Sequence, residues 1–360
     1  MTWPINNERR ALVMLRYLPW PLFLMLGRLW RNAGRYDKLT YACFYYAWKR
    51  KPSLSNLLAY LKFRRDLGLV MPSRFKFRLK QALPSATKAQ QHRIINWIIE
   101  SDVDVAFNES VLPVMQGLAG SSPPAAAYVQ KKHNARSISE DALPILQYRQ
   151  ESWREEFVHF IRNNKHSICV VGNCANTAKQ NRGDQIDRHG IVIRFNQYAL
   201  SEEGNEHSSE QNKRPSDIGG KIDVWVRAPG FNGPAPETAE SADWIIITGP
   251  DVRYQLSNWG NLNSFILNKK KVITVPLNVW RKLVRDLQSP PSAGILILAC
   301  LIEIADYKQA VSVTGFQQGG SEQERYQHAL PHHKASHRHN WKGERDLMRE
   351  WQRGGALAAL

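Results

Sequence analysis

The sequence lacks the features that mark several familiar classes of protein. Its 360 residues contain only four cysteines, and their spacing suggests neither a disulfide framework nor a Cys-type zinc site. The apolar stretch near the N-terminus, residues 17–27, is too short to span a bilayer, and the small-residue cleavage site of a secretory signal is missing. The nucleotide-binding patterns GxGxxG and GxxxxGK[ST] are absent as well. We therefore expect a globular chain in a reducing compartment.

Acidic residues are nearly absent from the first 90 positions. That segment holds 18 Lys and Arg against 3 Asp and Glu, a net charge of +15, whereas the remaining 270 residues hold 31 against 29 and carry only +2. A uniformly basic enzyme would spread its charge along the whole chain. The basicity therefore belongs to a separate N-terminal element with a partner of its own.

The same element is rich in aromatic residues, which occupy eleven of the first fifty positions. Basic and aromatic residues around a short apolar patch are typical of a segment that lies in the headgroup layer of an anionic membrane. We expect residues 1–50 to form such a membrane-surface segment. Two alternatives remain open: a small helical subdomain whose Trp and Tyr residues form its core, and a nucleic-acid binder, which only the basicity supports.

The rest of the chain changes character near residue 140. Apolar residues at mixed spacings of three and four predict a helical region over 51–139, with a linker near 117–127. Over 140–360, short β-branched runs alternate with helix-like stretches. The expected strands are 168–172, 191–195, 223–228, 244–248, 271–275 and 310–316. This alternation predicts an α/β domain in which helices flank a mostly parallel sheet.

Polar residues follow two of these strands at the point where each strand ends. Gly172 and Asn173 follow the first strand, and Arg194 and Asn196 mark the end of the second. Ligands of parallel sheets bind outside the carboxyl ends of the strands. The backbone amides and short amide side chains there could contact a nucleotide. Asn and Gly are also common in ordinary strand-ending turns, so that alternative remains.

The spacing of these residues resembles the large motif of the sialyltransferases of glycosyltransferase family 29. The stretch CVVGNCANTAKQNRGDQIDRHGIVIRFN matches that motif at Val170, Val171, Gly172, Asn173, Gly183, Ile186, Asp187, His189, Val192, Ile193, Arg194 and Asn196. A hundred residues later, PSAGILILACLIEIADYKQAVSVTGF resembles the small motif of the family at Pro291, Ser292, Gly294, Leu298, Val311, Val313, Gly315 and Phe316. HNWKGE resembles the short terminal motif through His339 and Glu344, and PHHK resembles its H-Y-Y motif through His332 and His333.

The departures from the family pattern bear on where the protein works. Family members carry one cysteine in the large motif and one in the small motif, and the two are bridged. Here Ile168 and Ala305 occupy those positions, which suits a reducing compartment. Cys174 and Ala293 stand where the family has hydroxyl residues. We therefore expect a cytoplasmic, bacterial-type relative, peripheral on the inner face of the cytoplasmic membrane.

The resemblance implies a modified Rossmann-like fold of the GT-A variant type and an inverting transfer that uses no bound metal and no cofactor. The donor would be the CMP ester of an acidic keto-sugar, sialic acid or Kdo. His339 would act as the base that deprotonates the acceptor hydroxyl, because the pKa of histidine lies near neutrality. His332 would stabilise the departing phosphate, together with the turn of Ser292, Ala293 and Gly294 at a helix start.

The nucleotide itself would be held by Gly172, Asn173 and Asn196. Asp187 and Arg194 would pair to stabilise the motif, and Glu344 would orient a neighbouring element or His339.

Five histidines crowd into twelve residues, at His328, His332, His333, His337 and His339. His333 shares with His332 the expected phosphate role. A zinc site is the evident alternative, but no HExxH pattern supports it. A solvated surface cluster is the other.

We therefore expect a glycosyltransferase that decorates a glycan or a lipid-linked saccharide, as in lipopolysaccharide biosynthesis, with no nucleic-acid partner. The alternative is a membrane-associated nucleotide-binding protein without transferase activity.

Overall fold

The computed structural model describes residues 19–101, 112–120, 142–164, 167–174, 177, 180–196, 215–228, 240–249, 263–305, 310–316 and 336–360. The chain divides into two compact units. The helical unit comprises Met1–Ser137, Trp280–Pro291 and His337–Asn340. The sheet unit comprises Ile138–Val279, Ser292–Ser336 and Trp341–Leu360.

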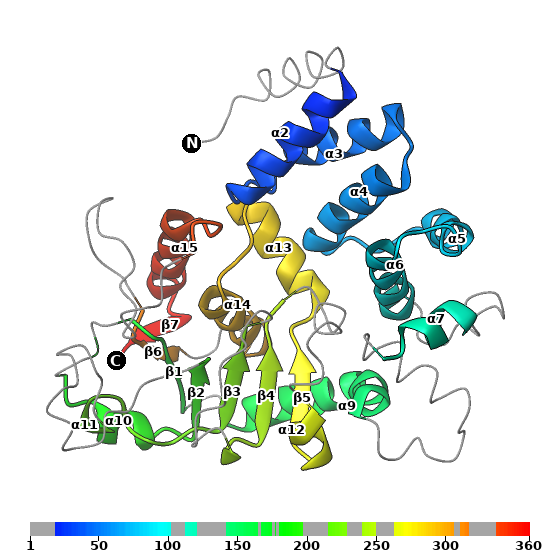
Figure 1. Cartoon of the computed structure of the whole chain (residues 1–360). Coiled ribbons are helices and arrows are strands. Elements are labelled where there is room, and N and C mark those ends of the chain that lie inside the picture. The colour runs from blue at the N-terminus through cyan, green and yellow to red at the C-terminus, as the bar shows by residue number, and fades with distance from the viewer. Residues whose placement is uncertain are drawn as a thin grey trace, which may run out of the picture. The chain divides into compact units, whose positions relative to one another are not determined.

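The first part of the helical unit is a series of short helices, coloured blue to cyan in Figure 1. They are α2 (Trp20–Asn32), α3 (Lys38–Arg50), α4 (Leu54–Asp66), α5 (Ser73–Ala82), α6 (Lys88–Ser101) and α7 (Leu112–Leu118). Side-chain caps begin two of them: Asp37 accepts from the Thr40 amide, and Ser53 accepts from the Asn56 amide. Among the described residues, no helix combines the length and apolar character needed to cross a bilayer.

Aromatic rings form the core of the helical unit. Phe63 of α4 is fully buried, and its ring lies 5.0 Å from Phe44 and 5.3 Å from Tyr36, centroid to centroid. Trp48 and Tyr60 stack with ring centroids 5.6 Å apart. Residues 19–50 and the helix that follows therefore share one core, although the sequence analysis treats 1–50 and 51–139 as separate regions. Ring packing between α2, α3 and α4 joins them.

Residues from the second half of the chain also belong to the helical unit. α13 spans Leu277–Leu287. Its Trp280 indole donates to the Asp66 carbonyl over 3.0 Å, and Arg281 Nε donates to the Gly68 carbonyl over 2.7 Å. The Tyr36 amide donates to the Gln288 carbonyl over 3.0 Å. The expectation of one domain over 140–360 did not anticipate this, because hydrogen bonds to backbone carbonyls leave no pattern in the sequence.

In the part of the chain that the structure describes, the sheet unit is built on seven strands that all run parallel. They are β1 (Ile168–Val171), β2 (Ile191–Phe195), β3 (Val224–Arg227), β4 (Trp244–Ile247), β5 (Lys271–Thr274), β6 (Val311–Thr314) and β7 (Leu357–Ala359), in the spatial order β5-β4-β3-β2-β1-β6-β7. The first six coincide with the six strands expected from the sequence. The α/β fold with a parallel sheet flanked by helices is therefore confirmed, and β7 is an addition.

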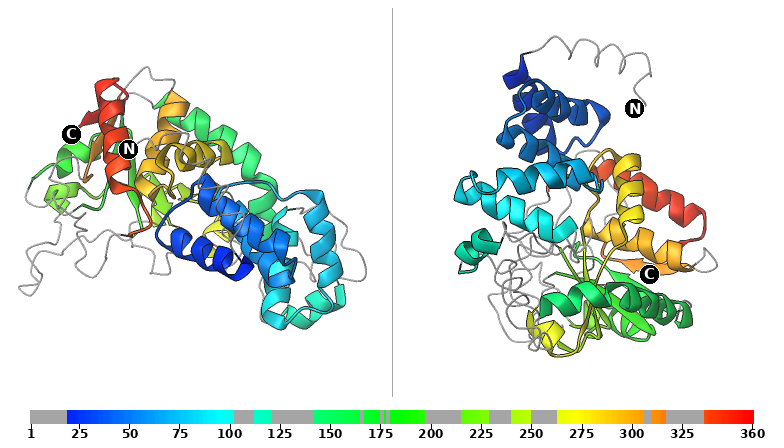
Figure 2. Two further views of the ribbon diagram at one scale, coloured as in Figure 1. Left: turned by 90° about the horizontal axis from the view of Figure 1, so that it is seen from above. Right: turned by 90° about the vertical axis from the view of Figure 1, so that its right-hand side faces the viewer.

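The helices of the sheet unit are α9 (Ala142–Asn163), α10 (Gly183–Asp187), α11 (Pro215–Ile218), α12 (Asn263–Leu267), α14 (Ala293–Ala305) and α15 (Trp341–Arg353). The side chains of each strand alternate between the two faces of the sheet, and the strand register shows which of them share a face. On one face, Cys169, Val171 and Val192 pack with Ile186 of α10 and Ile218 of α11. On the other, Trp244 lies 5.1 Å from the Phe157 ring of α9, which packs in turn against α14 (Figure 2).

The aromatic core makes a first prediction about stability. Phe63→Ala should lower the free energy of unfolding of the helical unit by about 3–5 kcal/mol, since loss of a fully buried ring leaves a cavity beside the Tyr36 and Phe44 rings. Denaturant titration followed by tryptophan fluorescence measures it. Phe77→Ala is the matched control, because Phe77 is 63% exposed and should change stability by less than about 0.5 kcal/mol. Equal losses in the two variants would contradict the described core.

Candidate active site

The sheet reverses its strand order beside β1. The chain passes from β1 through β2, β3 and β4 to β5 in one direction, and β6 is then added on the opposite side of β1. The connections that leave β1 and β6 at their carboxyl ends therefore diverge. In open parallel sheets this switch point is where ligands bind. Gly172 follows β1 and Gly315 follows β6, so the large and small motifs both reach this point.

The two glycines bring the backbones of β1 and β6 into contact. The Gly172 amide donates to the Thr314 carbonyl over 2.8 Å, and the Cys174 amide donates to the Gly315 carbonyl over 2.9 Å. A Cβ atom on either glycine would lie 2.3 Å from the carbonyl oxygen of the other, and Gly315 has a φ of +74°. No residue with a side chain fits here, so Gly172 and Gly315 fix the geometry of the switch point.

The asparagines at the strand ends are each partly engaged by the protein. Asn173 is buried, and its Nδ2 donates to the Phe195 carbonyl over 2.9 Å, which ties the end of β1 to the end of β2. Asn196 has a φ of +46°, and its Oδ1 accepts from the Ala228 amide over 2.8 Å. Within the described part of the chain, Asn196 Nδ2 makes no hydrogen bond. That nitrogen is the donor that Asn196 offers to a ligand.

The small motif begins α14 at the same edge of the sheet. Ser292 caps the helix through Oγ, which accepts from the Ile295 amide over 3.3 Å. A Cβ atom on Gly294 would lie 2.7 Å from the Phe316 ring, and that ring lies 6.2 Å from Phe195 at the end of β2. The small motif therefore packs against both strand ends that carry the large motif.

Among the described residues, two amide groups at this helix start have no hydrogen-bond partner. The N–H groups of Ala293 and Gly294 belong to the first turn of α14, where no preceding helical carbonyl can accept from them. They donate to no other group among the described residues. Together with the helix dipole they offer two hydrogen-bond donors to an anion.

Glu344 lies beneath the start of α14. Its carboxylate accepts from the Ser292 amide over 2.7 Å and from Ser292 Oγ over 2.6 Å. Burial raises the pKa of Glu344 to about 7, although both hydrogen bonds from Ser292 oppose the rise. Glu344 therefore joins the terminal motif to the small motif. In the described structure it orients the Ser292 turn.

Asp187 and Arg194 both bind the turn that precedes β3. Arg194 donates to the carbonyls of Lys221 and Ile218 over 2.8 and 2.6 Å. Asp187 accepts from the amides of Gly220 and Lys221 over 2.8 and 3.0 Å. The two charges lie 3.7 Å apart. This pair stabilises the large motif from the face of the sheet that α10 and α11 cover.

His339 belongs to the helical unit and is half-buried. Its Nδ1 lies 2.8 Å from the Pro290 carbonyl, which can only accept, so Nδ1 carries a proton and Nε2 of the neutral ring carries the lone pair. Burial lowers the pKa of His339, and the Arg338 charge lowers it further, whereas the Pro290 carbonyl acts in the opposite direction. Burial therefore favours the neutral ring, in which Nε2 carries the lone pair.

The turn between α2 and α3 holds the loop that carries His339. His337 Nε2 lies 3.0 Å from the Asn32 carbonyl, and Arg338 donates to the Tyr36 hydroxyl. A Cβ atom on Gly34, whose φ is +79°, would lie 2.5 Å from the Arg338 carbonyl oxygen. Gly34 and Tyr36 were not predicted from the sequence. The only signal was a glycine after a helix, which marks a helix end but not its partner.

His328, His332 and His333 lie outside the described residues. Within the ranges that the structure describes, no group of three or more His, Cys, Asp or Glu side chains is arranged to hold a metal ion. The four cysteines of the chain are all buried and free.

Gly34 provides a test of the contact between the α2–α3 turn and the loop that carries His339. Gly34→Ala should destabilise the helical unit by more than the ~1–2 kcal/mol cost of placing a side chain in left-handed backbone, because its Cβ also meets the Arg338 backbone. Gly355→Ala is the control: its φ is +74°, but a Cβ atom added there would have no neighbour within 4 Å. Thermal unfolding measures both. If Gly34→Ala loses no more stability than Gly355→Ala, the Arg338 backbone does not lie against Gly34.

Glu344 predicts a pH dependence of stability. Its folded pKa of about 7 lies above the ordinary value of 4.5, so the fold favours the protonated form. Relative to Glu344→Gln, the wild-type chain should lose stability as the pH rises from about 4.5 to about 7, by about 3 kcal/mol at most, and then level off. Glu350→Gln changes an exposed position on the same helix and keeps Glu344, so its curve should run parallel to the wild-type curve. Parallel curves for Glu344→Gln and wild type would contradict the burial of the carboxyl group.

No family model matches the chain, and no curated protein matches it. The chain is similar to two solved structures of mammalian sialyltransferase. One is a crystal structure in complex with Gal-beta-1-3GalNAc-ortho-nitrophenol, at 14% identity and a TM-score of 0.39, with 82% of this chain and 88% of that chain covered. The other has 14% identity and a TM-score of 0.38, with 81% and 86% covered.

Proposed function

We propose that the chain is an inverting glycosyltransferase that needs no metal and moves an acidic keto-sugar, sialic acid or Kdo, from its CMP ester to a hydroxyl of a glycan or lipid-linked saccharide. One observation carries the proposal. Residues from three motifs that lie far apart in the sequence form one chain of contacts at the switch point of the sheet: Gly172 with Gly315, Gly294 with Phe316, and Ser292 with Glu344. A structural role alone would not require all three to meet there.

The chemistry divides between holding the nucleotide and moving a proton. Asn196 Nδ2 lies at a strand end where a hydrogen-bond acceptor of cytidine can bind. The amides of Ala293 and Gly294 supply donors for the phosphate, which gains negative charge as its bond to the sugar breaks. A Glu344 side chain that is protonated for part of the time near pH 7 lessens repulsion of that phosphate.

His339 is assigned the role of the general base. Its Nε2 accepts the proton of the acceptor hydroxyl while the hydroxyl oxygen bonds to the anomeric carbon. The bond from that carbon to the phosphate oxygen breaks, and its electron pair leaves with CMP. Attack from the side opposite the phosphate inverts the configuration. The Pro290 carbonyl supports this role because it selects the tautomer that has its lone pair on Nε2.

Release of CMP tests the proposal. We expect release from CMP-sialic acid or CMP-Kdo in the presence of an acceptor saccharide, unchanged by EDTA, and none from UDP-sugars. Activity restricted to UDP-sugars with divalent metal would contradict the proposal. Binding of CMP by calorimetry without any release would favour the nucleotide-binding alternative.

The base is tested by substitution and by pH. His339→Ala should lower kcat/KM about 10²–10⁴-fold while CMP still binds. In the wild type, kcat/KM should fall on the acid side with an apparent pKa below 6.5, because burial lowers the pKa of His339. His159→Ala, at an exposed position on α9, is the matched control and should be neutral. An acid limb that persists in the residual activity of His339→Ala would show that another group titrates.

A further inference from the structure

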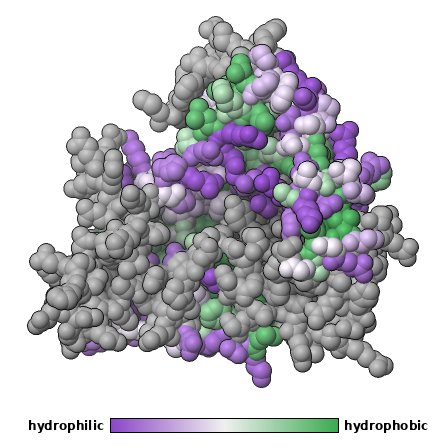
Figure 3. Space-filling model, in the orientation of Figure 1, coloured by the Kyte–Doolittle hydropathy of each residue, from purple (hydrophilic) through white to green (hydrophobic). Residues whose placement is uncertain are grey.

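Helix α2 presents an apolar stripe to solvent. Leu22, Met25 and Leu29 are 39%, 56% and 60% exposed, and their spacing of three and four residues places them on one face. The opposite face of the same helix carries Phe23 and Gly27, which are buried against α3. In the space-filling view, apolar surface gathers over α2 and hydrophilic surface borders it (Figure 3). α2 therefore has two apolar faces, one buried in the core of the helical unit and one exposed.

The aromatic residues of this region do not form the exposed stripe. Phe23 and Phe44 are buried, and Tyr45, Tyr46 and Trp48 pack against neighbouring rings. The alternative of ordinary helical packing therefore accounts for the aromatic side chains. It leaves the aliphatic stripe unexplained, because burying Leu22, Met25 and Leu29 would be favourable and the described residues of the helical unit leave them exposed.

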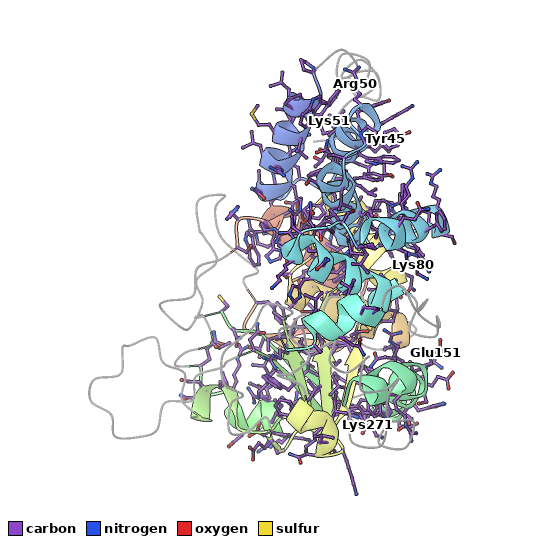
Figure 4. All side chains as sticks on the ribbon, turned by 45° about the vertical axis from the view of Figure 1, so that its right-hand side comes forward. Tyr45, Arg50, Lys51, Lys80, Glu151 and Lys271 are labelled. Atoms are coloured by element: carbon purple, nitrogen blue, oxygen red, sulfur yellow. The ribbon has the colours of Figure 1, made fainter. Side chains whose placement is uncertain are left out.

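Cations lie on both sides of α2. The end of α3 carries Lys49, Arg50 and Lys51, all exposed. Lys51 Nζ lies 4.7 Å from the ring centre of Trp20, and the Arg50 guanidinium lies 5.3 Å from that of Phe23, which places both beside the first turn of α2, on the side of the buried Phe23 (Figure 4). Arg28 is exposed on α2 itself. From residue 19 to 51 the sequence has seven Lys and Arg against a single acid, Asp37, which caps α3.

We propose that α2 docks the protein onto an anionic lipid surface, with Leu22, Met25 and Leu29 inserted at the headgroup boundary and Arg28 against the lipid phosphates, while the exposed Lys49, Arg50 and Lys51 at the end of α3 add electrostatic attraction to the surface. Aliphatic side chains on one helix face, flanked by cations and free of acids, match the chemistry of a negatively charged bilayer surface. A protein partner of the same shape would need a matching acidic rim, whereas an anionic membrane supplies negative charge everywhere. The inference is independent of the transferase reaction.

Vesicle co-sedimentation of the full chain tests the proposal. The wild type should pellet with vesicles of phosphatidylcholine containing phosphatidylglycerol and stay in solution with phosphatidylcholine alone. Met25→Gln/Leu29→Gln should weaken partitioning at least about tenfold because it removes the inserted side chains. Lys49→Gln/Arg50→Gln/Lys51→Gln should weaken it by a similar factor or more, and added salt should reduce wild-type binding.

Matched substitutions elsewhere in the helical unit distinguish binding through this face from nonspecific adsorption to the vesicles. Phe77→Gln removes a side chain that is 63% exposed on α5, and Arg74→Gln/Arg78→Gln/Lys88→Gln removes the same net charge from exposed positions. Both controls should pellet more than the two α2–α3 variants. All substituted positions are at the surface, and circular dichroism verifies that each variant folds.

Three outcomes would overturn the proposal. Equal pelleting of Met25→Gln/Leu29→Gln and the wild type would show adhesion by charge alone. Control variants that lose as much binding as the α2–α3 variants would show that no particular face is used. The third outcome is that light scattering without vesicles detects a dimer of the wild type that Met25→Gln/Leu29→Gln does not form. That result would identify the stripe as a contact between two copies of the chain.

Discussion

The contact between Gly172 and Gly315 is the constraint on which the sheet unit depends. The connections that follow β1 and β6 lead in opposite directions, and the two backbones can approach this closely at the strand ends only because neither residue has a side chain. The contact determines the position of Asn173, which follows β1, and of Phe316, which follows β6. Asn173 then reaches the end of β2, and Phe316 packs over Gly294 at the start of α14. A single tight approach therefore positions both long motifs.

Buried polar groups complete the two units. In the sheet unit, the Glu344 carboxylate beneath α14 satisfies the Ser292 amide and hydroxyl. Burial of this carboxyl group raises its pKa, which leaves it near its titration point at neutral pH. In the helical unit, the Pro290 carbonyl fixes the His339 ring, and the α2–α3 turn holds the loop. The N-terminal helices are thus part of the structure that presents this histidine, in addition to the lipid contact proposed for α2.

The sequence predicted the sheet well and the helical unit poorly, for physical reasons. β-Branched runs bounded by Gly and Asn identify buried strands, so β1 to β6 were predictable, whereas β7 has only three residues, Leu357–Ala359, and none of them is β-branched. Asp187 and Arg194 were expected to pair, but their shared partner, the 218–221 turn, is joined to them through backbone atoms. The membership of residues 280–287 of α13 and of residues 337–340 in the helical unit depends on donors such as Trp280 that bind carbonyls, and carbonyls are the same in every residue. Motif spacing led to Ser292 and Glu344 as candidates but not to the hydrogen bonds between them.

A crystal structure of the chain with CMP bound tests the central claim most directly. The account predicts the nucleotide at the carboxyl ends of β1 and β2, with a hydrogen bond from Asn196 Nδ2 to the nucleoside and the phosphate on the amides of Ala293 and Gly294. CMP bound at any other edge of the sheet, or on the helical unit alone, would contradict it.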